Sequence, residues 1–311
     1  MAWNLAIAVV SMAVFLGGLN IMRIGLAGLS QGRLPALLQR LANTPTRGIA
    51  TGTVVTALVQ SSAAVTAIAV GMVAGGSMAF RDALGIVLGS NVGSTVTPQL
   101  LALNLWVLVI PALAVGGILL FIPQTKLRYT GMALSGFAMI FIALQALSTA
   151  LKPLSQTVWF QQLLAGAAHN AVLAAVTGML ASAIIQSSTA TTVIAMALTG
   201  QSLIPVHGAI ALVLGANVGT CLTSVVAAIG QSRAAQQVAL SHVVLNVGGV
   251  LLFLPFLGPY THWMSLLSPS PAQQIANAHT LFNLICTVLV WPITPYFADF
   301  IERLLPDHRY A

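Results

Sequence analysis

Two stretches of the sequence decide the fold. The first contains Gln60-Ser61-Ser62 and then Gly89-Ser90-Asn91-Val92-Gly93-Ser94-Thr95, and the second contains Gln186-Ser187-Ser188 and then Gly215-Ala216-Asn217-Val218-Gly219-Thr220-Cys221. Gln60 and Gln186 are 126 residues apart, as are Asn91 and Asn217, so the two copies align without a gap. Two long copies in register indicate an internal duplication and predict two versions of one structural unit.

The composition is typical of a helical membrane protein. Of the 311 residues, 58% are hydrophobic and 5% are charged, whereas a soluble domain carries roughly 25% charged residues. The apolar runs have the length of about 20 residues that a membrane-spanning helix needs, and they lack the alternation of barrel strands. We therefore predict an all-α polytopic membrane protein. The net charge of +7 does not indicate nucleic-acid binding, because the basic residues lie between apolar runs, as topology signals do.

No cofactor or metal site other than one for sodium is predicted. Cys221 and Cys286 lie inside apolar segments without the spacing of metal ligands. Residues 4–22 have no basic segment before them and are expected to be a retained first span rather than a signal peptide. The predicted apolar segments are 4–22, 48–76, 82–99, 104–122, 131–150, 163–200, 207–229, 236–257 and 277–298.

The duplication defines the predicted organisation of the chain. Gly18-Leu19-Asn20-Ile21-Met22 resembles Gly136-Phe137-Ala138-Met139-Ile140 at an offset of 118 residues. Two later segments also match each other, since His242 and Asn246 correspond to His279 and Asn283 and each pair shares one helix face. The predicted parts are transmembrane repeat 1 (1–125), transmembrane repeat 2 (126–235), two further transmembrane helices (236–298) and a cytoplasmic tail (299–311).

The distribution of Lys and Arg predicts inverted repeats. Each repeat would have one span, a re-entrant pair of short helices broken at Gln-Ser-Ser, and two more spans. With the N-terminus outside and the C-terminus cytoplasmic, this arrangement leaves only Lys152 outside and places ten cations on the cytoplasmic side of the plasma membrane (a bacterial inner membrane). These ten are Arg23, Arg33, Arg40, Arg47, Arg81, Lys126, Arg128, Arg233, Arg303 and Arg309. A single span over 48–76 would give parallel repeats and would distribute the Lys and Arg residues less unequally between the two sides of the membrane. A hairpin of two full spans would give the same distribution as the re-entrant pair.

A helix broken inside a membrane is suited to binding ions. Irregular backbone is tolerated there only where it packs in protein or lines a wet cavity. The backbone amides and hydroxyls at such a break can hold an anion, and the carbonyls and hydroxyls can hold sodium. Ser and Thr also mediate contacts between membrane helices, but two copies in register favour a binding site. The spacing of Gly85, Gly89 and Gly93 is explained by helix packing, whereas packing alone does not explain Asn91 and Asn217.

The paired Gln-Ser-Ser segments, each followed by Gly-x-Asn-x-Gly-(Ser/Thr), and the later Ala-x-x-His-x-x-x-Asn segment resemble the sodium/phosphate cotransporter (type II Na/Pi) family, in the bacterial form without a PhoU-like C-terminal domain. The resemblance covers nearly the whole chain. It implies a transporter rather than an enzyme, which imports inorganic phosphate with sodium by alternating access. By position, the residues binding phosphate and sodium would be Gln60, Ser61, Ser62, Gln186, Ser187, Ser188 and Thr189, with Asn91, Ser94, Thr95, Asn217 and Thr220 adjoining.

The sequence departs from the family pattern at two places. The third Ser that commonly follows Gln-Ser-Ser is replaced by Ala63 and Thr189, and the acidic residue that bears on sodium count in animal members has no counterpart in 102–122.

The positions of the charged residues also constrain the mechanism. All four acidic residues lie near predicted span ends, and no Arg or Lys is predicted at the centre. Since an unpaired buried ion costs several kcal/mol, sodium and phosphate are expected to enter together.

Several alternatives stay open at this point. The substrate could be another oxyanion, such as arsenate or sulfate, or the coupling ion could be a proton. The same repeats could form a channel. An intramembrane serine hydrolase would use Ser61 or Ser187 with His242 or His279 as the base. The two histidines could instead carry protons, although an interhelical hydrogen bond with Asn246 and Asn283 is the simpler expectation. The oligomeric state is left open.

Overall fold

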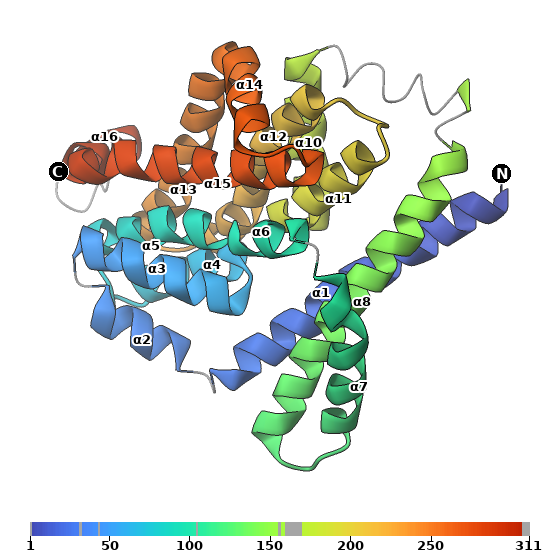
Figure 1. Cartoon of the computed structure of the whole chain (residues 1–311). Coiled ribbons are helices and arrows are strands. Elements are labelled where there is room, and N and C mark those ends of the chain that lie inside the picture. The colour runs from blue at the N-terminus through green and yellow to red at the C-terminus, as the bar shows by residue number, and fades with distance from the viewer. Residues whose placement is uncertain are drawn as a thin grey trace.

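The computed structural model describes residues 2–30, 33–42, 44–103, 105–154, 157–158 and 170–306. These residues form helices and connecting turns, with no strand among them (Figure 1). The first half contains α1 (Ala2–Leu29), α2 (Leu34–Leu41), α3 (Pro45–Val59), α4 (Ser62–Ala74), α5 (Phe80–Gly93), α6 (Val96–Ala102), the 3₁₀ turn η1 (Trp106–Leu108), α7 (Val109–Leu120) and α8 (Thr125–Leu154). The second half contains α10 (Ala171–Ile185), α11 (Ser188–Gly200), α12 (Val206–Ala228), α13 (Arg233–Phe253), η2 (Leu254–Phe256), α14 (Leu257–Leu267), α15 (Pro271–Val290), η3 (Trp291–Ile293) and α16 (Thr294–Leu304).

Within the described residues, five helical stretches are long and apolar enough to cross a membrane. These are Trp3–Leu29, Thr125–Leu151, Val206–Ala228, Arg233–Leu267 and Pro271–Leu304. A sixth candidate consists of Phe80–Ala102 and Trp106–Leu120, which meet at an angle of 88°. The all-helical, polytopic class predicted from the sequence is therefore confirmed. The re-entrant and inverted arrangement of the repeats stays a prediction.

The predicted apolar segment 48–76 contains two helices, α3 and α4, rather than one. Two helices, α10 and α11, likewise occupy the described part of segment 163–200, and residues 163–169 lie outside the described residues. Three of these four, α4, α10 and α11, are apolar helices too short to count as spans by themselves. Both copies of the duplicated unit thus divide at the same motif.

The two copies also pack in the same way. A Cβ atom added at Gly89 in α5 would lie 2.0 Å from the carbonyl oxygen of Ile49 in α3. The matching contact in the second copy is between Gly215 in α12 and Ala175 in α10, where the distance would be 1.8 Å. Because Ile49 and Ala175 are also 126 residues apart, the two pairs of helices repeat one close contact. The motif glycines allow this approach, since any side chain would separate the backbones.

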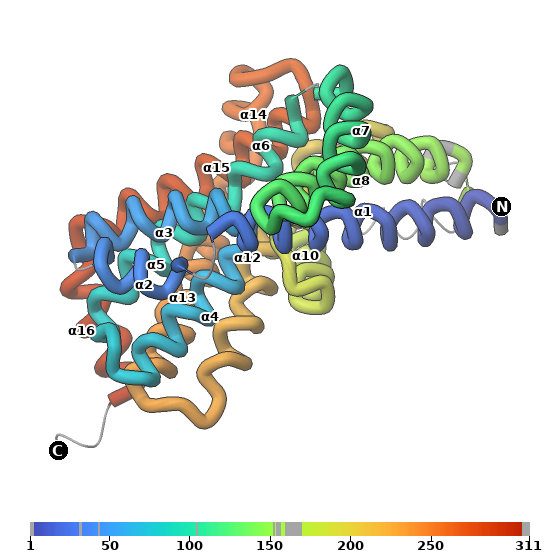
Figure 2. Tube along the Cα trace, turned by 90° about the horizontal axis from the view of Figure 1, so that it is seen from below, coloured from blue at the N-terminus to red at the C-terminus, as the bar shows by residue number. Residues whose placement is uncertain are grey.

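Helices α1 and α8 form a long antiparallel pair that extends from the main body, with α7 packed on α8 (Figures 1 and 2). Glycines bring these helices close together as well, because a Cβ atom at Gly136 would lie 2.4 Å from the amide nitrogen of Met22. Helix α1 also contacts α3 in the main body, close to its own C-terminal end. Arg23 lies in this part of α1.

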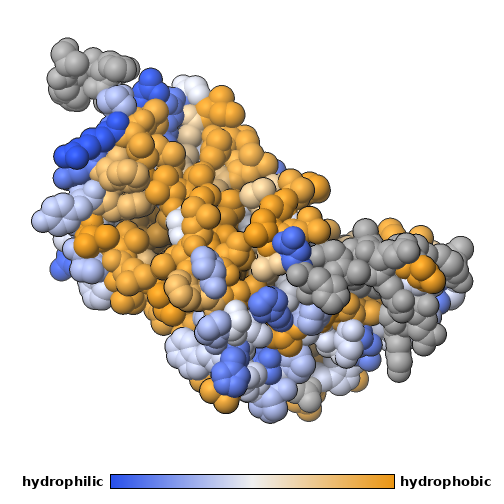
Figure 3. Space-filling model, turned by 90° about the horizontal axis from the view of Figure 1, so that it is seen from above, coloured by the Kyte–Doolittle hydropathy of each residue, from blue (hydrophilic) through white to orange (hydrophobic). Residues whose placement is uncertain are grey.

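Large apolar side chains remain exposed over much of the surface. Ile110 is 76% exposed, Ile184 is 82% exposed and Leu251 is 67% exposed. Figure 3 shows apolar residues over most of one face, with hydrophilic residues gathered toward its upper left and lower parts. Such a surface is expected where lipid, rather than water, surrounds the protein.

Candidate functional site

Each Gln-Ser-Ser motif ends one helix and begins the next. Gln60 and Gln186 adopt left-handed backbone conformations, with φ of 61° and 57°, and thereby end α3 and α10. Ser61 and Ser187 are the N-caps of α4 and α11. The Ser61 hydroxyl accepts a hydrogen bond from the Ala64 amide, and the Ser187 hydroxyl accepts one from Ala190, both at 3.1 Å. A left-handed residue other than glycine is uncommon, and here it recurs at the same place in both copies.

The two breaks meet at a small cavity. Its volume is about 10 Å³, which is close to the minimum for one water molecule. The residues that line it are Arg23, Ser61, Ser62, Ala63, Gln186, Ser187, Ser188, Thr189 and Thr220. Seven of the predicted site residues are thus brought together from three helices and the breaks between them.

The first residues of two helices face this cavity. In each case the lining residues are the N-cap and the first two residues of the helix, which are Ser61 to Ala63 in α4 and Ser187 to Thr189 in α11. The serine caps bind the amides of the third residues, and helix geometry leaves the first amides without acceptors in their own helix. Helix N-termini carry free N–H donors and a partial positive charge, so two of them facing one cavity make it suited to an anion.

Arg23 adds a full positive charge to the cavity wall. Its Nε–H donates to the carbonyl oxygen of Gln60 at 2.9 Å, and its Nη2 donates to the Ser187 hydroxyl at 2.8 Å. The prediction that no Arg or Lys lies at the centre was wrong for this residue, which had been assigned to the topology signal. The sequence does indicate that Arg23 lies within a helix rather than in a loop after it, because the apolar character of α1 continues past Arg23 to Leu29.

The remaining predicted residues of the first copy do not line the cavity. Gln60 contributes its backbone carbonyl to Arg23, while its side chain donates to the carbonyl of Ala57. Ser94 and Thr95 donate to carbonyls of their own helical segment. The carbonyl of Ser94 also accepts a hydrogen bond of 3.4 Å from the Thr189 hydroxyl, which links the two copies next to the site.

Asn91 takes part in a buried network between helices. Its Oδ1 lies 3.1 Å from Nε2 of His242, and its Nδ2 donates to Oδ1 of Asn246 at 3.2 Å. The other ring nitrogen of His242 lies 3.0 Å from the hydroxyl of Ser224. An interhelical hydrogen bond is present for His242, as expected, but the partner of its ring is Asn91 on α5 rather than Asn246, which bonds the backbone carbonyl of His242 within α13. The network joins α13 to α5 and α12.

Asn217 has the equivalent place in the second copy. Its Oδ1 lies 3.1 Å from Nε2 of His279 and 3.3 Å from Nδ2 of Asn283, so α12 is joined to α15. Here Nδ1 of His279 and Oδ1 of Asn283 are buried without a partner among the described residues. Neither His242 nor His279 forms a hydrogen bond with Ser61 or Ser187 in the described part of the chain, so the nucleophile and base of a serine hydrolase are not paired.

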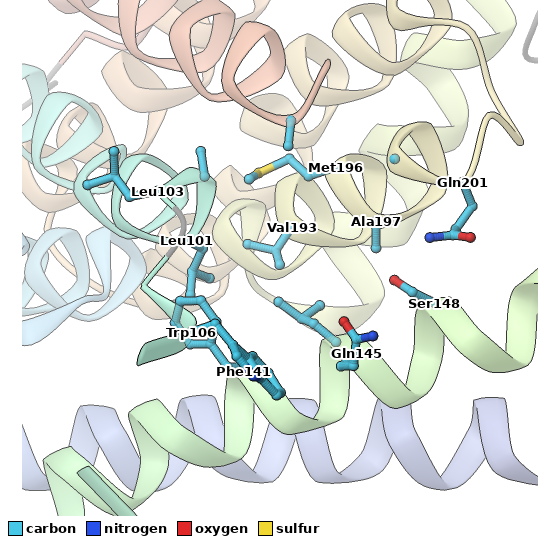
Figure 4. A pocket seen from close by; sticks show the side chains of 14 residues that line it. Leu101, Leu103, Trp106, Phe141, Gln145, Ser148, Val193, Met196, Ala197 and Gln201 are labelled. Atoms are coloured by element: carbon cyan, nitrogen blue, oxygen red, sulfur yellow. The ribbon is translucent and has the colours of Figure 1, made fainter. Parts of the chain in front are cut away.

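A much larger cavity of about 570 Å³ lies elsewhere, where residues of α8, α11 and the segment around η1 meet (Figure 4). Its wall contains none of the Gln-Ser-Ser residues. Trp106, Phe141 and Met196 make much of it apolar, whereas Gln145 and Gln201 lie toward one end. It offers no charged group, so the smaller cavity is the better candidate for an ion site. The described residues contain no group of three His, Cys, Asp or Glu side chains that could hold a metal ion.

A sequence profile of the Na+/Pi-cotransporter family matches the chain twice, over residues 14–149 and 145–286. The chain belongs to the Na+/Pi-cotransporter family. The resemblance predicted from the motifs is thereby confirmed, and the double match agrees with the internal duplication. No solved structure matches the chain.

Relatives of this family member come from bacteria and animals. The uncharacterized protein YqeW of Bacillus subtilis is 35% identical over 293 residues, which cover 94% of this chain and 95% of YqeW. The putative inorganic phosphate export protein YjbB of Salmonella typhimurium is 30% identical over 96% of this chain, which spans only 55% of YjbB. The sodium-dependent phosphate transport protein 2B of Rattus norvegicus is 32% identical over 119 residues, covering 36% of this chain and 17% of the rat protein.

Proposed function

We propose that this chain is a secondary transporter that carries inorganic phosphate across the plasma membrane together with sodium. The observation that carries this proposal is the convergence of two helix N-termini, from α4 and α11, on one cavity. Free amides and serine hydroxyls at these termini are suited to phosphate oxygens. The family match supports phosphate as the substrate and sodium as the coupling ion.

The proposed mechanism is alternating access around the two breaks. Each Gln-Ser-Ser motif joins two short helices, as in transporters that bind their substrates between inverted repeats. The site would therefore open to one side of the membrane at a time, and sodium would bind among the same hydroxyl and carbonyl oxygens. Orientation with the N-terminus outside and the C-terminus in the cytoplasm belongs to the same proposal, because it is the orientation in which the inverted arrangement places most Lys and Arg residues on the cytoplasmic side.

The argument for coupling to sodium now comes from the family match and no longer from the number of charged residues in the apolar segments. That number suggested that sodium must neutralise phosphate because no cation was expected nearby, and Arg23 removes that premise. Sodium can still raise the affinity for phosphate by occupying an adjacent site, and phosphate would then raise the affinity for sodium equally. Coupling to protons, or transport of another oxyanion, would be the alternative outcome.

The direction of transport follows from the gradients once coupling is established. A symporter driven by an inward sodium gradient imports phosphate, which is the direction we propose. The name of YjbB favours export as the second candidate. Both directions describe a transporter rather than an enzyme.

Uptake of radiolabelled phosphate into proteoliposomes tests the proposal. Wild-type protein should accumulate phosphate only when sodium is higher outside, and an imposed outward sodium gradient should drive efflux from loaded vesicles. The Ser61→Ala and Ser187→Ala variants should transport more slowly. Phosphate uptake that ignores sodium would contradict the coupling, and normal transport by both variants would contradict the site.

A further inference from the structure

We propose that Arg23 is the charge partner of the transported anion, and that its guanidinium is what favours a doubly charged oxyanion over a singly charged one at this site. This inference rests on the proposed function, since it assigns a role to one residue of the same site. It concerns a side chain that lies outside both Gln-Ser-Ser motifs and was not expected at the site.

The first argument is that Arg23 has no anionic partner among the residues that the structure describes. Its two hydrogen bonds go to neutral oxygens, the carbonyl of Gln60 and the hydroxyl of Ser187. No carboxylate lines the cavity. The ion pairs within the described residues are those of Arg81 with Asp299 and Glu302, and Arg23 is in neither. A partly buried cation without a counter-charge is unfavourable, and an anion in the cavity would supply that counter-charge.

The second argument is the amount of positive charge at the cavity. Each helix N-terminus is equivalent to about half an elementary charge, so those of α4 and α11 together supply about one. The guanidinium of Arg23 supplies one more. The sum of about two positive charges matches a dianion better than a monoanion. Without Arg23, only the two helix termini would remain, and they would balance a single negative charge.

The third argument is the shape of the guanidinium. Arg23 presents two donors to two different breaks, and the planar fork of an Arg side chain suits two oxygens of a tetrahedral anion. The cavity of about 10 Å³ is too small for phosphate in this conformation. Binding therefore requires the breaks to separate, and the bonds from Arg23 to Gln60 and Ser187 would be exchanged for bonds to the anion.

A purely structural role makes a different prediction. If Arg23 only ties α1 to the two breaks, any loss caused by its replacement should be independent of the charge of the ligand. A charge partner, in contrast, should matter more for the dianion than for the monoanion. The pH dependence of phosphate binding separates the two roles, because inorganic phosphate changes from monoanion to dianion across its second pKa.

The test is equilibrium binding of radiolabelled inorganic phosphate to the purified full-length protein at fixed sodium, on either side of that pKa. Arg23→Gln should weaken binding of the dianion by at least about 30-fold, the loss expected for truncating one member of a buried charge pair. Arg23→Lys, which keeps the charge but not the fork, should lose less. Arg81→Gln is the matched control, because its ion pairs are exposed and none of their members lines the cavity, and it should bind as the wild type does.

Three results would overturn the assignment of Arg23. These are wild-type affinity in Arg23→Gln, equal losses in the folded Gln and Lys variants, and a loss in Arg23→Gln that is the same for monoanion and dianion. If Arg23→Gln does not fold, Arg23→Lys decides alone: a retained preference for the dianion supports the assignment and a lost preference overturns it. Wild-type protein that binds no phosphate would end the proposed function, and this inference with it. Wild-type binding with an unaffected Arg23→Gln variant would leave the function standing.

Discussion

The serine caps of the two breaks should contribute unequally to stability, although the duplication makes them equivalent in sequence. Ser61 and Ser187 each accept one hydrogen bond from the amide three residues later. Replacing an N-cap serine by alanine costs about 1 kcal/mol, so this loss should be shared by Ser61→Ala and Ser187→Ala. Only Ser187 also accepts a hydrogen bond from Arg23, at 2.8 Å.

The additional loss in Ser187→Ala can be worked from that bond. A hydrogen bond to a charged group contributes about 1.5–3 kcal/mol. Because Arg23 is only partly buried and water can replace part of the interaction, we expect the lower half of this range, about 2 kcal/mol. Ser187→Ala should therefore lose about 3 kcal/mol in total, against about 1 kcal/mol for Ser61→Ala.

Thermal unfolding of the purified variants in one detergent measures this order. Ser270→Ala is the matched control, since Ser270 caps α15 through the amide of Gln273 without a contact to an Arg side chain among the described residues. It should resemble Ser61→Ala, and Ser187→Thr should recover most of the stability because it retains the acceptor oxygen. Equal unfolding temperatures for Ser61→Ala and Ser187→Ala would refute the contribution of the Arg23 bond.

Two further predictions concern the packing of the repeats and are read out by the same unfolding measurement. Gly215→Ala should destabilise the protein by about 1–3 kcal/mol, because the added Cβ would lie 1.8 Å from a carbonyl oxygen of α10. Gly117→Ala in α7 is the control and should not change the stability, because its Cβ would meet no atom within 4 Å. Equal effects of the two substitutions would contradict the close contact. His242→Ala should be more destabilising than His279→Ala, because among the described residues the ring of His242 has two hydrogen-bond partners and that of His279 has one. The reverse order would contradict this explanation.

The sequence predicted the helix breaks well because their cause is local. A repeated Gln-Ser-Ser inside an apolar run combines a residue that can end a helix with a serine that can cap the next one. In both copies one helix does end at the Gln, and the next begins after the first Ser. The convergence of the two motifs was implied by the resemblance to the cotransporter family, which assigns residues of both motifs to one site. These conclusions needed no knowledge of how the other helices pack.

The positions of Arg23 and Asn91 could not be predicted in this way. Arg23 reaches the cavity only because α1 packs along α8 and ends beside α3, and a count of cations per loop contains no such information. The hydrogen bonds of Asn91 depend on His242, more than 150 positions later in the chain. In both cases the deciding contact is made between helices, and the spacing of residues along one helix does not specify it.

Arg23 also shows where the duplication stops being symmetric. The offset of 118 residues that aligns Ile24 with Ile142 aligns Arg23 with Phe141, an apolar side chain in the wall of the larger cavity. Within the described residues, the two copies of the helix break share the guanidinium of Arg23, which donates to both breaks at once. An anion that draws Arg23 away from one break must also weaken its bond to the other. In the proposed site, this single charge would link the responses of the two breaks to the anion.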